Sequence, residues 1–171
     1  MNEPFQAVIY LGLALYAAVL IHAAMSDLRR LEIPNVDSII LAVGFIPAAL
    51  LAGVGAIDIA WAAGIAVGML ALGIFLFARG LFGGGDAKLL AAVVLWTAPA
   101  DIPRLLAVMA ILGGGLALAV LLARKLAPRA PILADVFPWL SNSEPHLPYG
   151  VAIAGAGLCM ITRSPLLAAL N

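Results

Sequence analysis

The sequence has few charged residues, few aromatic residues and a single cysteine. Asp, Glu, Lys and Arg make up 11% of the 171 residues, whereas hydrophobic residues make up 65% and the mean hydropathy is +1.15. A soluble globular domain contains about 25% charged residues, so this composition does not fit one. We therefore expect an integral membrane protein.

The scarcity of charge and cysteine also excludes several classes of function. The formal net charge is zero, so no basic surface is expected to bind nucleic acid. Cys159 is the only cysteine and cannot form an intrachain disulfide or a multi-cysteine zinc site, so we expect it to be a small buried side chain. Neither His22 nor His146 has companions at metal-ligand spacing. We expect no metal ion and no cofactor.

Six apolar segments, separated by charged or proline-containing breaks, predict the fold. A helix needs about 20 apolar residues to cross a hydrocarbon core of roughly 30 Å. The first segment lacks the basic start of a secretory signal, so we interpret it as an uncleaved span. The expected fold is all-α, a single-domain bundle of about six transmembrane helices over residues 5–25, 38–54, 58–79, 86–99, 103–123 and 148–166.

The positions of Lys and Arg predict the orientation of this bundle. If the connection after the first span faces the cytoplasm, that side carries seven of the nine basic residues. The positive-inside rule then places the N-terminus outside. Asp27 and Asp86 would both lie near the cytoplasmic face.

The segment Leu81–Leu90, LFGGGDAKLL, places an aspartate after three glycines and between apolar runs. A carboxylate within or at the edge of a span costs about 2.5 to 3.5 kcal/mol, which makes Asp86 a candidate functional residue. The preceding glycines would let another backbone approach closely. By contrast, the glycines of residues 112–117, LGGGLA, have no acid beside them, and close helix packing explains them sufficiently.

A second candidate, Asp27, directly follows the first expected span. Two carboxylates brought close together do not both ionise readily and share one proton. Such a pair can hydrolyse a peptide, because one carboxylate takes a proton from water while the other, protonated, hydrogen-bonds the scissile carbonyl. The alternative is that Asp27 is a capping residue at a helix end. Asn35 and Asp37, just before the second span, are expected to be helix caps.

Together, three motifs resemble those of the type IV prepilin peptidases. The sequence GGGDAKLL matches the G-x-G-D motif of polytopic aspartyl peptidases, and it occurs with DLRRLEIPN at residues 27–35 and PYG at residues 148–150. The resemblance covers essentially the whole chain and implies that Asp27 and Asp86 are catalytic. It implies an aspartic endopeptidase of a prokaryotic inner membrane that removes the leader of type IV prepilins on the cytoplasmic side. The implied partners are a prepilin with a basic leader and a hydrophobic helix, membrane lipid and pilus assembly machinery.

The chain departs from the longer, bifunctional members of this family. Those members carry a cytoplasmic insertion with paired Cys-x-x-Cys elements and also methylate the new N-terminus. Here the first connection is short and has no cysteine, so we expect no methyltransferase activity. The chain instead resembles the short members of Flp-type tight-adherence pilus systems, or their archaeal preflagellin relatives.

Other residues near the aspartates could shape the site or the approach of substrate. Lys88 lies two positions after Asp86, which is about 200° around a helix, so a direct pair between them is not expected. Lys88 could instead bind lipid headgroups or an acidic residue of the substrate. The expected site-shaping residues are Gly83, Gly84, Gly85, Lys88, Tyr149 and Gly150.

Two functions of other classes remain open from the sequence. A small transporter or proton relay could use paired intramembrane acids, although no inverted repeat supports it. A noncatalytic pilus assembly factor could pack other helices through GIAVG, residues 64–68.

Overall fold

The computed structural model of the chain describes residues 3–127, 137–141 and 147–168. These residues form helices joined by short connections, and they contain no β-strand. The expected all-α class is therefore confirmed for the described part of the chain.

Helices occur at each of the six expected apolar segments. The main difference from expectation is at α1, which continues to Arg30, so that Asp27 lies inside the helix and not after it. The last expected span is also shorter, because α7 ends at Cys159 and is followed by a 3₁₀ turn and α8. The helices are α1 (Glu3–Arg30), α2 (Asn35–Leu51), α3 (Ala56–Ala78), α4 (Gly84–Leu95), α5 (Ile102–Leu126), α7 (Tyr149–Cys159) and α8 (Pro165–Ala168).

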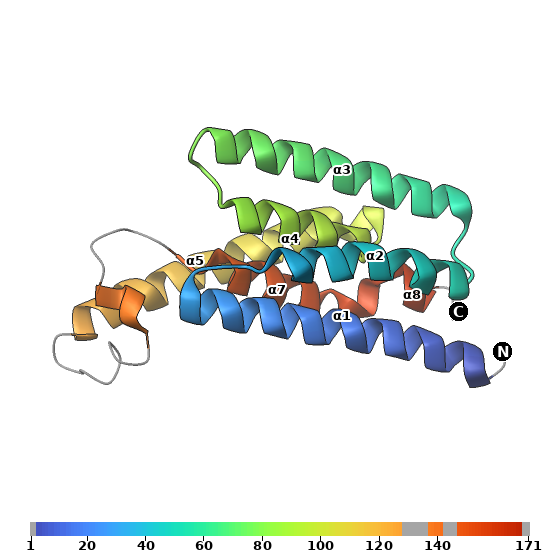
Figure 1. Cartoon of the computed structure of the whole chain (residues 1–171), viewed down its shortest axis with the longest axis horizontal. Coiled ribbons are helices and arrows are strands. Elements are labelled where there is room, and N and C mark those ends of the chain that lie inside the picture. The colour runs from blue at the N-terminus through green and yellow to red at the C-terminus, as the bar shows by residue number, and fades with distance from the viewer. Residues whose placement is uncertain (1–2, 128–136, 142–146, 169–171) are drawn as a thin grey trace.

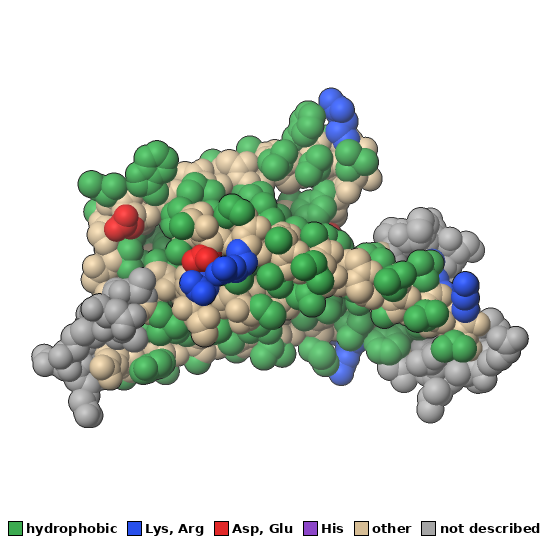
Figure 2. Space-filling model, turned by 180° about the vertical axis from the view of Figure 1, so that it is seen from behind, with side chains coloured by type: hydrophobic (Ala, Val, Ile, Leu, Met, Phe, Trp, Pro, Cys, Tyr) green, Lys and Arg blue, Asp and Glu red, His purple; other side chains and the backbone are tan. Residues whose placement is uncertain are grey.

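Three of these segments are long and apolar enough to cross a membrane, by length and composition: Gln6–Arg30, Ala56–Ala78 and Pro99–Leu126. The helices α2 and α7 are apolar but shorter. The 12 residues of α4 extend only about 18 Å at 1.5 Å per residue, less than a hydrocarbon core of roughly 30 Å. Figure 2 shows that hydrophobic side chains cover most of the visible lateral face, as expected for contact with lipid.

The helices α1, α3 and α5 run in one direction along the bundle, and α2, α4 and α7 run in the opposite direction (Figure 1). As a result, the C-terminal end of α1 and the N-terminal ends of α2, α4 and α7 lie at the same end of the bundle. The helix α3 packs mainly against α4, and α7 contacts α1, α4 and α5. This topology brings together the two sequence regions that contain Asp27 and Asp86.

The short helix α4 lies in the interior of the bundle. Its residues from Leu89 to Val94 are all buried. Since neighbouring helices cover it, α4 can be shorter than a helix that must cross the bilayer in contact with lipid.

Cys159, which we expected to be buried, is exposed at the end of α7.

Trp96 links the end of α4 to α1 and α2. Its ring stacks on Tyr16 at 5.0 Å between centroids and meets the edge of Phe45 at 5.7 Å. Its indole Nε1–H donates a hydrogen bond of 2.9 Å to the carbonyl of Leu41. A buried indole usually finds such a partner, and here it joins two helices.

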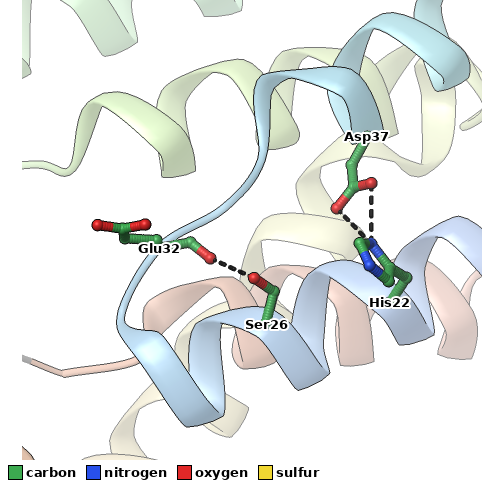
Figure 3. Close-up of polar contacts among 4 residues, drawn as sticks. All are labelled: His22, Ser26, Glu32 and Asp37. Atoms are coloured by element: carbon green, nitrogen blue, oxygen red, sulfur yellow. Dashed lines mark hydrogen bonds and ion pairs between the residues drawn. The ribbon is translucent and has the colours of Figure 1, made fainter.

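The connection between α1 and α2 is held by polar contacts (Figure 3). His22 Nδ1 lies 3.0 Å from both carboxylate oxygens of Asp37, and Ser26 Oγ donates to the carbonyl of Glu32 at 2.8 Å. Asp37 is buried in the first turn of α2. The expectation that Asn35 or Asp37 caps this helix was wrong: Pro34 is the N-cap and no side-chain hydrogen bond caps α2, because the Asp37 carboxylate binds His22.

Replacing His22 by Ala should lower the stability of the fold. The change would leave the buried Asp37 carboxylate without its side-chain partner, at a cost of about 1 to 3 kcal/mol. Thermal unfolding in detergent measures this change. The control is Arg104→Ala, which removes an exposed pair with Asp101 at 3.4 Å and should cost less than about 1 kcal/mol. Equal shifts for the two variants would contradict the prediction.

Candidate active site

Asp27 occupies the last turns of α1 and is only 4% exposed. The helix ends just after it, where Leu31 adopts a left-handed conformation with a φ of 56° and donates its N–H to the Asp27 carbonyl at 2.8 Å. The indole Nε1–H of Trp139 donates to the Leu28 carbonyl at 2.8 Å. Carbonyls at a helix C-terminus lack intrahelical donors, so these two bonds hold the backbone that directly follows the Asp27 side chain.

The Asp27 carboxylate faces the N-terminus of α7. The backbone N–H of Gly150 donates to Asp27 Oδ2 at 2.7 Å, and the N–H of Val151 also acts on this carboxylate. The N-terminus of a helix offers free N–H groups and a partial positive charge, both of which favour a nearby carboxylate. The start of α7 is therefore the element that holds Asp27.

Asp86 lies in the first turn of α4 and is partly buried. The backbone N–H of Gly83 and the negative charge of Asp27 both act on the Asp86 carboxylate. The two aspartates, 59 positions apart in the chain, thus come within range of each other's charge at one end of the bundle. Two carboxylates in this relation can share a proton.

The three glycines before Asp86 have different surroundings. A Cβ on Gly83 would collide with the Asp86 carboxylate, and this glycine is exposed. Gly84 lies against Phe77, whose ring would be 3.3 Å from an added Cβ, and Gly85 lies against Ile33 at 3.1 Å. The chain's own side chains therefore occupy the space beside the second and third glycines, and Gly83 is the one that borders solvent beside Asp86.

Ile33 is a site residue that sequence reasoning missed. Its side chain packs against Gly85 and would also clash with a Cβ on Gly150, at 2.6 Å. It therefore fits between the first turns of α4 and α7. The sequence feature that could have pointed to Ile33 is its position within the DLRRLEIPN motif. No sequence feature indicated that Trp139 would bind the end of α1.

Tyr149 and Lys88 stabilise the elements that surround the aspartates. The Tyr149 ring lies against Gly113 of α5, where an added Cβ would be 2.7 Å away, and it meets Phe82 edge-on at 6.0 Å. The expectation that close packing explains the glycines of LGGGLA is thus confirmed for Gly113 but wrong for Gly114 and Gly115, which face open space. Lys88 Nζ donates to Asn35 Oδ1 at 2.8 Å, which joins the start of α4 to the start of α2.

No group of three His, Cys, Asp or Glu residues that could hold a metal ion occurs in the described ranges 3–127, 137–141 and 147–168. His146 lies outside the described residues. The chemistry that the described side chains of this site can perform is proton transfer by two carboxylates, with backbone N–H groups holding each of them.

Comparison with known proteins agrees with these observations. The family model of the type IV leader peptidase family matches residues 14–118, which include both aspartates. The chain belongs to the type IV leader peptidase family. No curated protein and no solved structure matched the chain. Tyr149 and Gly150 lie beyond the matched range, so the structure alone connects α7 with the aspartates of this leader peptidase.

Replacing Gly150 by Ala should inactivate this leader peptidase. An added Cβ would lie 2.8 Å from Asp27 Oδ2 and would displace that carboxylate. A displacement of about 1 Å in an active site can lower the rate by about a hundredfold. Cleavage of a leader-bearing precursor by equal amounts of membrane protein measures the effect. Gly114→Ala is the matched control, since open space surrounds Gly114; unchanged cleavage by Gly150→Ala would contradict the prediction.

Replacing Lys88 by Ala should reduce cleavage more than it reduces protein level. Loss of the bond to Asn35 would release the start of α4 from α2 and lower the rate about threefold to tenfold, the range expected for one hydrogen bond. Asn35→Ala should have the same effect, and the double variant should add little. Lys125→Ala, at an exposed lysine near the end of α5, serves as a control. Equal losses of cleavage and protein level would indicate a role in folding or anchoring.

Proposed function

We propose that this protein is a membrane aspartic endopeptidase that removes the leader peptide of type IV, Flp-like prepilins on the cytoplasmic side of the membrane. The observation that carries the proposal is the pairing of Asp27 of α1 with Asp86 of α4 within range of each other's charge, in a chain of the leader peptidase family. Water held between the two carboxylates is the nucleophile.

Both aspartates take part in each step of the proposed reaction. One carboxylate accepts a proton from the water as the water oxygen attacks the scissile carbonyl carbon, while the protonated partner donates a hydrogen bond to the carbonyl oxygen. The C–N bond then breaks, and a proton passes from the pair to the leaving amine. The N–H groups of Gly150 and Gly83 hold the two side chains in place, so the geometry exists before substrate binds.

The distribution of basic residues supports a cytoplasmic active site. Because successive helices alternate in direction, the C-terminal ends of α1, α3 and α5 lie at the end of the bundle that contains the aspartates. Under the positive-inside rule this end faces the cytoplasm. The described basic residues at this end are Arg29, Arg30, Arg79, Lys88, Arg124 and Lys125, whereas Arg104 and Arg163 lie at the opposite end.

The substrate must be extended where it is cut, because a helix shields its own carbonyls through hydrogen bonds. Gly83 is exposed beside the Asp86 carboxylate and has no side chain to block an extended peptide. The connection between α1 and α2 contains only residues 31–34, which leaves no space for a cysteine-containing insertion. These features favour a leader peptidase without methyltransferase activity, of the short type associated with Flp-like prepilins.

Replacing either aspartate by Asn should abolish leader removal without preventing membrane insertion. Each change removes one of the two groups that transfer protons, a loss of about a hundredfold or more. The measurement is cleavage of a panel of Flp-like prepilins and preflagellins by purified protein, with the cut located by mass spectrometry. Asp58→Asn, at an exposed aspartate in the first turn of α3, is the control.

Normal processing by Asp27→Asn or Asp86→Asn would remove that residue from the catalytic role. No cleavage of any substrate by the folded parent protein would instead favour a proton relay or an assembly factor.

A further inference from the structure

An apolar groove lies along α4 on the side that faces α2 and α3. Its volume is about 750 Å³, and apart from Asn35, Ser38 and Lys88 its lining is apolar. All three polar residues belong to the first two turns of α2 or α4, so they lie at the end of the groove nearest the aspartates. The rest of the groove extends from there into the apolar part of the bundle.

The dimensions of the groove fit one face of a helix. The groove follows α2 from Asn35 to Ile46 and α3 from Ile59 to Leu70, about 16 Å in each case at 1.5 Å per residue. A helix about 10 Å across, embedded to half its depth over that length, occupies roughly 650 Å³. This value is close to the volume of the groove.

The walls of the groove allow a helix to approach closely from the side. Small side chains line all three walls: Ala42 on α2, Ala63 and Ala66 on α3, and Ala91 and Ala92 on α4. Small residues let helix backbones pack closely within a membrane. Large apolar side chains at the rim, including Ile39, Ile46 and Val67, are exposed. The groove is therefore open to a helix that already lies in the lipid.

Ser38 provides a separate indication of an occupant. The residue is 8% exposed, and its Oγ is buried without a hydrogen-bond partner among the described residues. The first four N–H groups of any helix also lack intrahelical partners. A helix that begins beside Ser38 would supply a donor, and Ser38 Oγ would accept a hydrogen bond from its first turn once the side chain rotates toward the groove.

We propose that this groove binds the membrane-spanning helix of the prepilin, with the first turn of that helix beside Ser38. The inference rests on the proposed function and names the surface that recognises its substrate. Asp86 and the groove residue Lys88 point about 200° apart around α4, so the cut site and the groove lie on opposite faces of this helix. The substrate therefore passes from one face to the other over the N-terminus of α4, at Gly83. Crossing a helix about 10 Å wide takes roughly three extended residues. The cut therefore lies about three residues before the substrate helix begins.

Filling the groove tests the proposal with two substrates. One is a full prepilin, and the other is a short peptide that contains only the leader and the cut site. Ala63→Phe should lower kcat/KM for the full prepilin about tenfold more than for the peptide, mainly through KM, because the phenyl ring occupies the space of the helix. Ala60→Phe, one turn away on α3 and outside the groove, should behave as the parent protein.

Crosslinking identifies the occupant directly. A photo-crosslinking residue at Val67, which lines the groove and is 66% exposed, should capture the prepilin helix. The same residue at Val43, which is 65% exposed but lies outside the groove, should not. Capture of lipid without prepilin at Val67 would overturn the proposal and assign the groove to lipid.

The outcomes separate this proposal from the proposed function. Equal losses on both substrates with Ala63→Phe, or no loss on either, would overturn the docking site while cleavage by the parent protein still supports the peptidase. Absence of cleavage of both substrates by the parent protein would overturn the peptidase itself.

Discussion

The arrangement of the site depends on one hydrogen bond, from the backbone N–H of Gly150 to the Asp27 carboxylate at 2.7 Å. Asp27 is almost fully buried, and a buried carboxylate is costly unless polar groups bind it. The N-terminus of α7 provides those groups. The bond also requires glycine at position 150, because any Cβ there would meet both Asp27 and Ile33. The contact between α1 and α7 thus requires the N-terminus of α7 to face Asp27, a residue without a side chain at position 150, and N–H groups that attract the carboxylate.

The buried position of α4 follows from the same packing. α4 is too short to cross a bilayer by itself, and α2, α3 and α7 pack around it. Protein contacts therefore replace lipid contacts along most of α4. This position allows a carboxylate at its first turn to remain near the end of the bundle, where Gly83 is exposed and water can reach Asp86. A fourth helix that began earlier in the chain would occupy the space at Gly83 through which water reaches Asp86.

The two faces of α4 have different roles in the proposed function. One face carries Asp86, on which the charge of Asp27 acts, and the other forms the apolar groove with α2 and α3. Lys88 and Asn35 join α4 to α2 at the mouth of that groove. Chemistry and substrate recognition can therefore share one rigid helix, which keeps the distance between them constant. An extended peptide crossing the N-terminus of α4 would connect the two faces.

Composition and pattern alone predicted the all-α class and the approximate positions of six apolar helices, and they selected Asp27 and Asp86 as candidates, because apolar runs and isolated carboxylates are local features of the chain. Contacts between distant residues could not be read in this way. The His22–Asp37 pair, the packing of Ile33 against two glycines and the bond from Trp139 to Leu28 each join segments separated along the chain. Only the tertiary structure decided them, since helix direction and side-chain size determine which residues meet once the helices pack.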